Sequence, residues 1–128
     1  MSSPVRRAYR RAMGFEKMRV YQAALLLDAE ACRLIVGIGR GYGDDVNQLL
    51  RALGSILFNI AEAYGSDTVG RKRYHLQVAR ASSDESRSVL QRLAARGAFD
   101  GKSILKACSL TSAIAKMLTA WMDRLPPD

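Results

Sequence analysis

The chain has 128 residues, a formal net charge of +8 and an apolar fraction of 48%, a composition typical of one globular domain. No stretch reaches the roughly 18 uninterrupted apolar residues of a membrane span, and the longest candidate is broken by Asp28, Glu30 and Arg33. The two cysteines, Cys32 and Cys108, form no CxxC motif, so we expect a cytoplasmic protein with reduced thiols.

The first residues are strongly basic, and we assign residues 1–14 to an N-terminal arm that precedes one domain at 15–125. The arginines of this arm are Arg6, Arg7, Arg10 and Arg11. Such an arm suits an anionic partner, most often nucleic acid. A solvated tail is the alternative, and an arginine-rich, acid-poor start is also typical of organelle transit peptides. No long apolar segment follows, so we expect no secretory signal.

Helical spacing of apolar residues predicts a first helix over about 18–36. Its inner residues are Val20, Ala23, Ala24, Leu27, Ala31, Leu34 and Ile35. The sequence GIGRGYG ends it, because glycine is costly inside a helix. This run lacks the GxxxxGK[ST] pattern of a phosphate loop, so we expect a connection between helices.

Three more helices follow, with breakers between them. The second is capped by Asp44 or Asp45 and ends at Gly65, the usual C-terminal position for glycine. Its apolar side is Leu49, Leu53, Ile56, Leu57 and Ile60. The third covers about 69–96, with an inner stripe of Tyr74, Val78, Ala81, Val89 and Leu93. The fourth covers about 103–124, and prolines stop it. This pattern predicts an all-α, antiparallel up-down four-helix bundle.

The third helix carries Glu85 within its predicted inner stripe, and an unpartnered buried carboxylate is costly. We therefore expect a structural polar seam between the second and third helices. Its members are Arg51, Ser55, Asn59 and Glu62 on the second helix, with Ser82 and Glu85 on the third.

Catalytic and metal chemistry find little support in the sequence. His75 is the sole histidine, and the carboxylate-bridged metal sites of helical bundles need Glu-x-x-His motifs on two helices. Glu62 and Glu85 could form an acid–base pair, but no nucleophile or cationic clamp accompanies them. We therefore expect no enzyme activity, no metal and no cofactor.

Three arginines of the third helix, Arg73, Arg80 and Arg87, recur every seven residues and therefore share one face. Together with the N-terminal arginines, they are candidates for contacts to a phosphate backbone. A solvated outer face is the alternative interpretation.

Two paired motifs in the chain resemble the signature of a bacterial family first recognised in proteins encoded by intervening sequences of 23S ribosomal RNA genes. The first, RAxxSIxxNIAEGxGR, is matched by Arg51, Ala52, Ser55, Ile56, Asn59, Ile60, Ala61, Glu62 and Gly65. The second, ARGSxxE, is matched by Ala79, Arg80, Ser82 and Glu85. The chain departs from the family pattern at three positions: Ala63 replaces the glycine after NIAE, Ser66 replaces the arginine after the later glycine, and Ala81 replaces the glycine of ARGS.

This resemblance implies a four-helix bundle that assembles into a homopentameric ring and has no established catalytic activity. It also implies a fold similar to the accessory protein of diversity-generating retroelements, which binds nucleic acid and a polymerase. We accordingly expect a non-enzymatic oligomeric scaffold that associates with RNA or DNA, and a nucleic-acid enzyme is a further candidate partner. The alternative is an adaptor that binds proteins and no nucleic acid.

Overall fold

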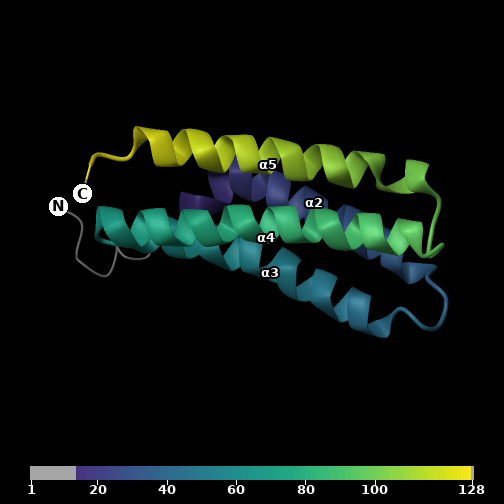
Figure 1. The fold of residues 1–128 in the computed structure, drawn as a ribbon. Coiled ribbons are helices and arrows are strands. Elements are labelled where there is room, and N and C mark those ends of the chain that lie inside the picture. The colour runs from purple at the N-terminus through teal and green to yellow at the C-terminus, as the bar shows by residue number, and fades with distance from the viewer. Residues whose placement is uncertain (1–13, 128) are drawn as a thin grey trace.

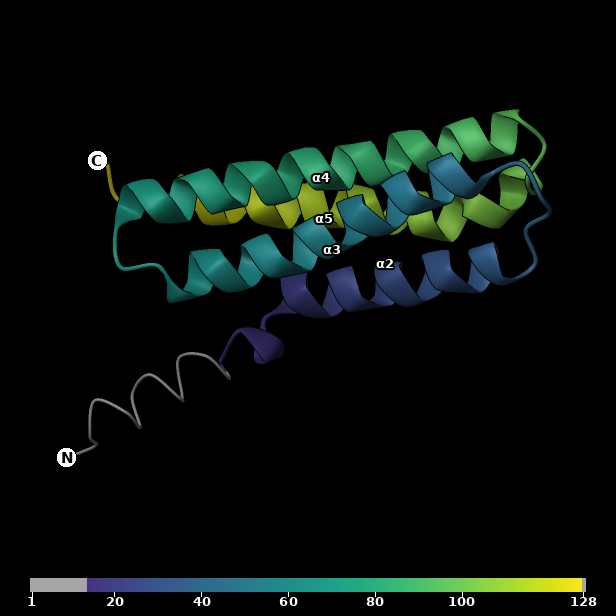
Figure 2. The ribbon, with the colours of Figure 1, turned by 90° about the horizontal axis from the view of Figure 1, so that it is seen from below.

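The computed structural model describes residues 14–127, which form four long α-helices and contain no β-strand. The helices are α2 (Arg19–Val36), α3 (Gly43–Gly65), α4 (Val69–Ala95) and α5 (Leu105–Arg124), with short 3-10 turns η1 (Phe15–Lys17) and η2 (Gly101–Ile104). Consecutive helices run in opposite directions, and each packs against two neighbours, in the order α2, α3, α4, α5 and back to α2 (Figures 1 and 2). The predicted all-α bundle is confirmed for these residues. The predicted N-terminal arm, except for Gly14, lies outside them.

The ends of α4 follow from local chemistry. At its start, Thr68 Oγ1 accepts a hydrogen bond from the Arg71 N–H at 3.2 Å, which satisfies one free donor of the first turn. At its end, Gly97 has a φ of +85°, and the Ala98 N–H reaches the Leu93 carbonyl at 2.9 Å. This is a Schellman termination, and it ends α4 close to the boundary predicted at about residue 96.

The predicted cap of α3 is wrong. The N-cap residue is Tyr42, and it makes no side-chain cap hydrogen bond. Asp45 instead points its carboxylate across to α4, where two arginines hold it. An ion pair with two cations outcompetes the single N–H bond that a capping carboxylate would gain.

The core contains most of the inner residues predicted for α2 and α3, together with one face of α5. The buried apolar side chains of these three helices, with Thr111 among them, are Val20, Ala24, Leu27, Ala31, Leu34, Leu49, Ala52, Leu53, Ile56, Ile60, Ala63, Ala107, Thr111, Ile114, Leu118 and Met122. For α4 the predicted stripe is largely wrong, because Tyr74 and Ala81 are exposed and Val78 is half-buried. Of the predicted stripe, Val89 and Leu93 are buried.

The buried face of α4 consists instead of Leu76, Ala79, Ser82, Ser83, Ser86, Val89, Leu90 and Leu93. Serine can be buried here because each hydroxyl has a partner. Ser83 Oγ donates to the Thr111 carbonyl at 3.1 Å, and Ser86 Oγ donates to the Ser82 carbonyl at 2.9 Å. The small side chains let α4 fit between α3 and α5, which flank it on two sides.

Candidate nucleic-acid interface

A row of three arginines, Arg73, Arg80 and Arg87, lies along α4 on the side that faces α5. We call it the arginine row. Seven residues of helix rise by about 10.5 Å, so successive members are separated by roughly that distance along the axis. Arg80 Nη1 donates to Thr119 Oγ1 at 3.2 Å, and Arg87 Nη1 donates to Ser112 Oγ at 2.9 Å. Arg73 donates to the carbonyls of Met122 and Pro126, both at 3.4 Å. The sequence predicted that the three arginines share one face of the helix, but not that their side chains contact α5.

All the acceptors of the arginine row are neutral. Among residues 14–127, no carboxylate lies within ion-pair distance of Arg73, Arg80 or Arg87. Each guanidinium has five N–H donors and uses one or two of them here. The unused donors and the positive charge, which no ion pair engages, suit phosphate oxygens, which guanidinium groups bind in a forked geometry. The N-terminal arginines at positions 6, 7, 10 and 11 lie outside the described residues.

A second feature is a chain of hydrogen bonds between α3 and α4. Ser82 Oγ donates to Ser55 Oγ at 2.7 Å, and Asn59 Nδ2 donates to the Ser55 carbonyl at 2.8 Å and to its Oγ at 3.1 Å. Asn59 Oδ1 lies 2.9 Å from His75 Nδ1. This contact adds His75 of α4 to the hydrogen-bonded chain.

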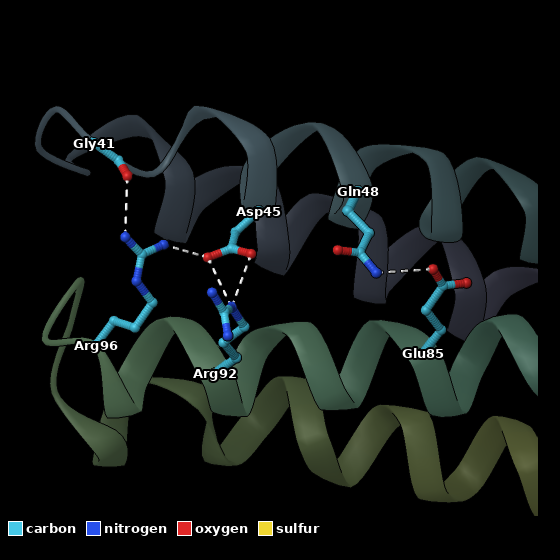
Figure 3. Close-up of polar contacts among 6 residues, drawn as sticks. All are labelled: Gly41, Asp45, Gln48, Glu85, Arg92 and Arg96. Carbon is cyan, nitrogen blue, oxygen red and sulfur yellow. Dashed lines mark hydrogen bonds and ion pairs between the residues drawn. The ribbon is translucent and has the colours of Figure 1, made fainter.

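Three of the six residues predicted for the polar seam lie in this chain, namely Ser55, Asn59 and Ser82, and His75 is an addition. The other three, Arg51, Glu62 and Glu85, are exposed. The expectation that Glu85 is buried is wrong, because α4 turns its serines rather than Glu85 toward the core. Glu85 accepts from Gln48 Nε2 at 3.3 Å at the surface (Figure 3).

A buried carboxylate that the sequence did not reveal lies near the other end of α4. Asp45 is 6% exposed and accepts from Arg96 Nη1 at 2.5 Å and from Arg92 Nε at 3.1 Å (Figure 3). Arg96 also donates to the Gly41 carbonyl at 3.2 Å, and its guanidinium carbon lies over the Tyr42 ring, 4.9 Å from the ring centroid. The hydrogen bond from Arg96 lowers the pKa of Asp45, against the opposing effect of burial. These contacts fasten the α2–α3 connection to the end of α4.

Glu30 on α2 is a second buried carboxylate. Its oxygens bind Arg33 Nη2 at 2.5 Å and lie 3.9 Å from Lys106 Nζ on α5. The hydrogen bond from Arg33 lowers the pKa of Glu30, and both cations add to this effect. Sequence spacing could have suggested the Glu30–Arg33 pair, since residues three apart are neighbours on a helix.

The cysteines and the possible metal ligands form no further site in the described part of the chain. Partial desolvation raises the pKa of the half-buried Cys108 thiol and of the exposed Cys32 thiol, which disfavours the nucleophilic thiolate. In the described part of the chain, no three His, Cys, Asp or Glu residues gather in a metal-binding group. No helix of that part is long and apolar enough to cross a bilayer.

Apolar residues are exposed on α2 and α3. On α2 the spacing i, i+4, i+7, i+11 places Leu25, Ala29, Cys32 and Val36 in one exposed row. On α3, Leu50 and Phe58 are exposed, and Phe58 is 70% accessible. They line an open depression of about 570 Å³ with Arg51, Gly54, Ser55 and Asn59. We call these the apolar rows of α2 and α3. Large exposed apolar side chains of this kind mark contact surfaces.

Comparison with known proteins is informative at the level of the family. The model described as 23S rRNA-intervening sequence protein matches residues 16–120, which include all four helices except the last turn of α5. No curated protein and no solved structure matches the chain.

Proposed function

Since this chain belongs to the 23S rRNA-intervening sequence protein family, we propose that it is a cytoplasmic, non-enzymatic accessory protein that self-associates and binds nucleic acid through basic surfaces. The observation that carries the proposal is the arginine row. Arg73, Arg80 and Arg87 bind neutral acceptors and meet no carboxylate among residues 14–127. Three cations in line, none of them in an ion pair among residues 14–127, favour a linear polyanion over a single small anion.

The ligand we propose is the phosphate backbone of RNA or DNA. Contacts to phosphate position a protein on nucleic acid but carry no sequence information. We therefore expect binding that depends on charge and shape, with weak discrimination between sequences. A nucleic-acid enzyme that works on the same RNA or DNA is a further candidate partner.

Self-association is the second part of the proposal, and the apolar rows of α2 and α3 support it. Exposed Leu25, Val36, Leu50 and Phe58 would leave water on contact between copies, which is the main favourable term in protein association. The resemblance of the sequence motifs implies a homopentameric ring. Five chains at +8 each would then carry about +40, which concentrates the basic surfaces of five arginine rows on one particle.

The test is fluorescence anisotropy of a labelled structured RNA and of a labelled duplex DNA, titrated with the full chain at 50 and 200 mM salt. With roughly six to ten phosphate contacts, affinity should fall by about 10³ to 10⁵ between these conditions. The preference between the two probes identifies the nucleic acid. Absence of binding at 50 mM salt would contradict the proposal and favour the adaptor alternative.

A further inference from the structure

A pocket of about 370 Å³ opens between the start of α2 and the end of α5. Its lining residues are Met18, Arg19, Val20, Met117, Ala120, Trp121 and Arg124. No residue of α4 contributes to it. The arginine row, by contrast, contacts α5 from the α4 side. The pocket is therefore a separate feature from the proposed nucleic-acid interface.

The floor of the pocket is apolar and adaptable. Met18, Met117 and Trp121 are half-buried, and Val20 is buried beneath them. Methionine side chains are flexible and polarizable, so they fit apolar groups of different shapes. Tryptophan is among the residues that contribute most to binding at protein interfaces. Such a floor can receive a large apolar side chain.

The mouth of the pocket is positively charged. Arg19 and Arg124 are exposed, and no carboxylate lines the pocket. Neither arginine forms an ion pair with a carboxylate in the described part of the chain. A ligand that combines an apolar group with nearby negative charge would match both the floor and the mouth.

We propose that this pocket docks an acidic segment of a partner protein. One large apolar side chain of that segment enters between Met18, Met117 and Trp121, and flanking carboxylates bind Arg19 and Arg124. Pockets that enclose whole small molecules have volumes of about 300–1,000 Å³ and bury most of the ligand. This pocket is near the lower end of that range and half open, so it suits one anchoring side chain of a longer segment.

The single tryptophan of the chain makes the proposal directly testable, because Trp121 is the only source of tryptophan fluorescence. The full chain is titrated with three hexapeptides that lack aromatic residues. The first is acetyl-Asp-Glu-Leu-Leu-Asp-Glu-amide. The second has serine in place of both leucines, and the third has lysine in place of all four acidic residues. Only the acidic leucine peptide should shift the Trp121 emission saturably below about 1 mM. In methyl NMR spectra, the Met18 and Met117 signals should move with the same affinity.

Variants show whether the effect comes from this pocket. Arg124→Glu should weaken the acidic leucine peptide by about tenfold or more, and Ala120→Phe, which fills the pocket from an exposed position, should also weaken it. Arg40→Glu makes the same change of net charge on the α2–α3 connection and should change affinity less than about twofold. Circular dichroism verifies that each variant is folded.

Three results would overturn the proposal. The first is no saturable shift with the acidic leucine peptide, and the second is an equal shift with the Ser-Ser peptide. The third is equal weakening by Arg124→Glu and Arg40→Glu, which would indicate a nonspecific charge effect. A shift of Trp121 emission caused by an RNA oligonucleotide, without any by the peptide, would assign the pocket to nucleic acid instead. These results are independent of whether the arginine row binds RNA.

Discussion

Ser82 on α4 donates a hydrogen bond to Ser55 on α3, with the two Oγ atoms 2.7 Å apart and Ser82 buried. This bond joins the two halves of the paired motif, which lie 27 residues apart in the sequence. A buried hydroxyl with a satisfied partner lets the small serine side chain stay in the core, and the small side chain lets the two helices pack closely.

We expect Ser82→Ala to lower the free energy of unfolding by about 1 kcal/mol, the typical net contribution of one such bond. Urea denaturation of the full chain measures this change. Ser88→Ala is the matched control, because Ser88 is exposed on the same helix and should change stability by less than about 0.5 kcal/mol. Equal effects of the two substitutions would show that the Ser55–Ser82 bond contributes nothing.

Glu85 should tolerate substitution, although its position in the sequence suggests a buried role. Its side chain is exposed and its one hydrogen bond, to Gln48, is at the surface. Glu85→Ala should therefore change the free energy of unfolding by less than about 0.5 kcal/mol. A loss several times larger, measured by the same urea titration, would mean that Glu85 has a buried partner after all.

Asp45 should make the stability of the bundle sensitive to acid. Its pKa is lowered in the folded state by Arg96 and Arg92, whereas an unfolded aspartate titrates near about 3.9. The ionised form is therefore favoured by folding. Its contribution is fully present above the unfolded pKa and is lost as the pH falls through the folded pKa.

Asp45→Asn should lower the urea midpoint at pH 7, and the difference from the native chain should shrink as the pH falls from 5 to 3. Asp44→Asn is the control, because Asp44 is exposed and adjacent. A difference between Asp45→Asn and the native chain that stays constant over this range would contradict the ion-pair account.

The apolar rows of α2 and α3 should determine the oligomeric state. Leu25→Glu combined with Phe58→Glu places two charges where apolar side chains are exposed, so it should leave the fold intact and abolish assembly. Size-exclusion chromatography with light scattering measures the mass. Leu105→Glu is the control, because Leu105 is exposed on α5 and belongs to neither row. A native chain that is a monomer would remove the basis for self-association.

The sequence predicted the fold well where the core is made of large apolar residues. On α2 and α3, Leu27, Leu53 and Ile60 follow helical spacing and are buried, so their pattern identified the inner face. On α4 the buried face contains Ser82, Ser83 and Ser86, which a hydrophobic pattern counts as polar. The inner stripe predicted for α4 therefore lies partly on a different side of the helix from the face that is buried.

The candidate site was predictable only in part. The spacing of seven placed Arg73, Arg80 and Arg87 on one face, but their neighbours on α5 depend on how the helices pack. Asp45 lies 47 residues from Arg92 and 51 from Arg96. Such a pairing depends on the register in which α3 and α4 pack against each other. A pattern within one helix does not predict that register.

The most direct test of the central claim is the salt dependence of RNA binding by a variant with Arg73, Arg80 and Arg87 all changed to Gln. Glutamine removes the charge and keeps a polar side chain with a hydrogen-bond donor. A control variant removes three charges from exposed sites outside the row, through Arg40→Gln, Arg71→Gln and Lys102→Gln. If the arginine row contacts phosphates, the slope of log affinity against log salt should become shallower by roughly 2 to 3 in the row variant. The control slope should stay close to that of the native chain. Equal slopes for the two variants would contradict the arginine row as the nucleic-acid interface.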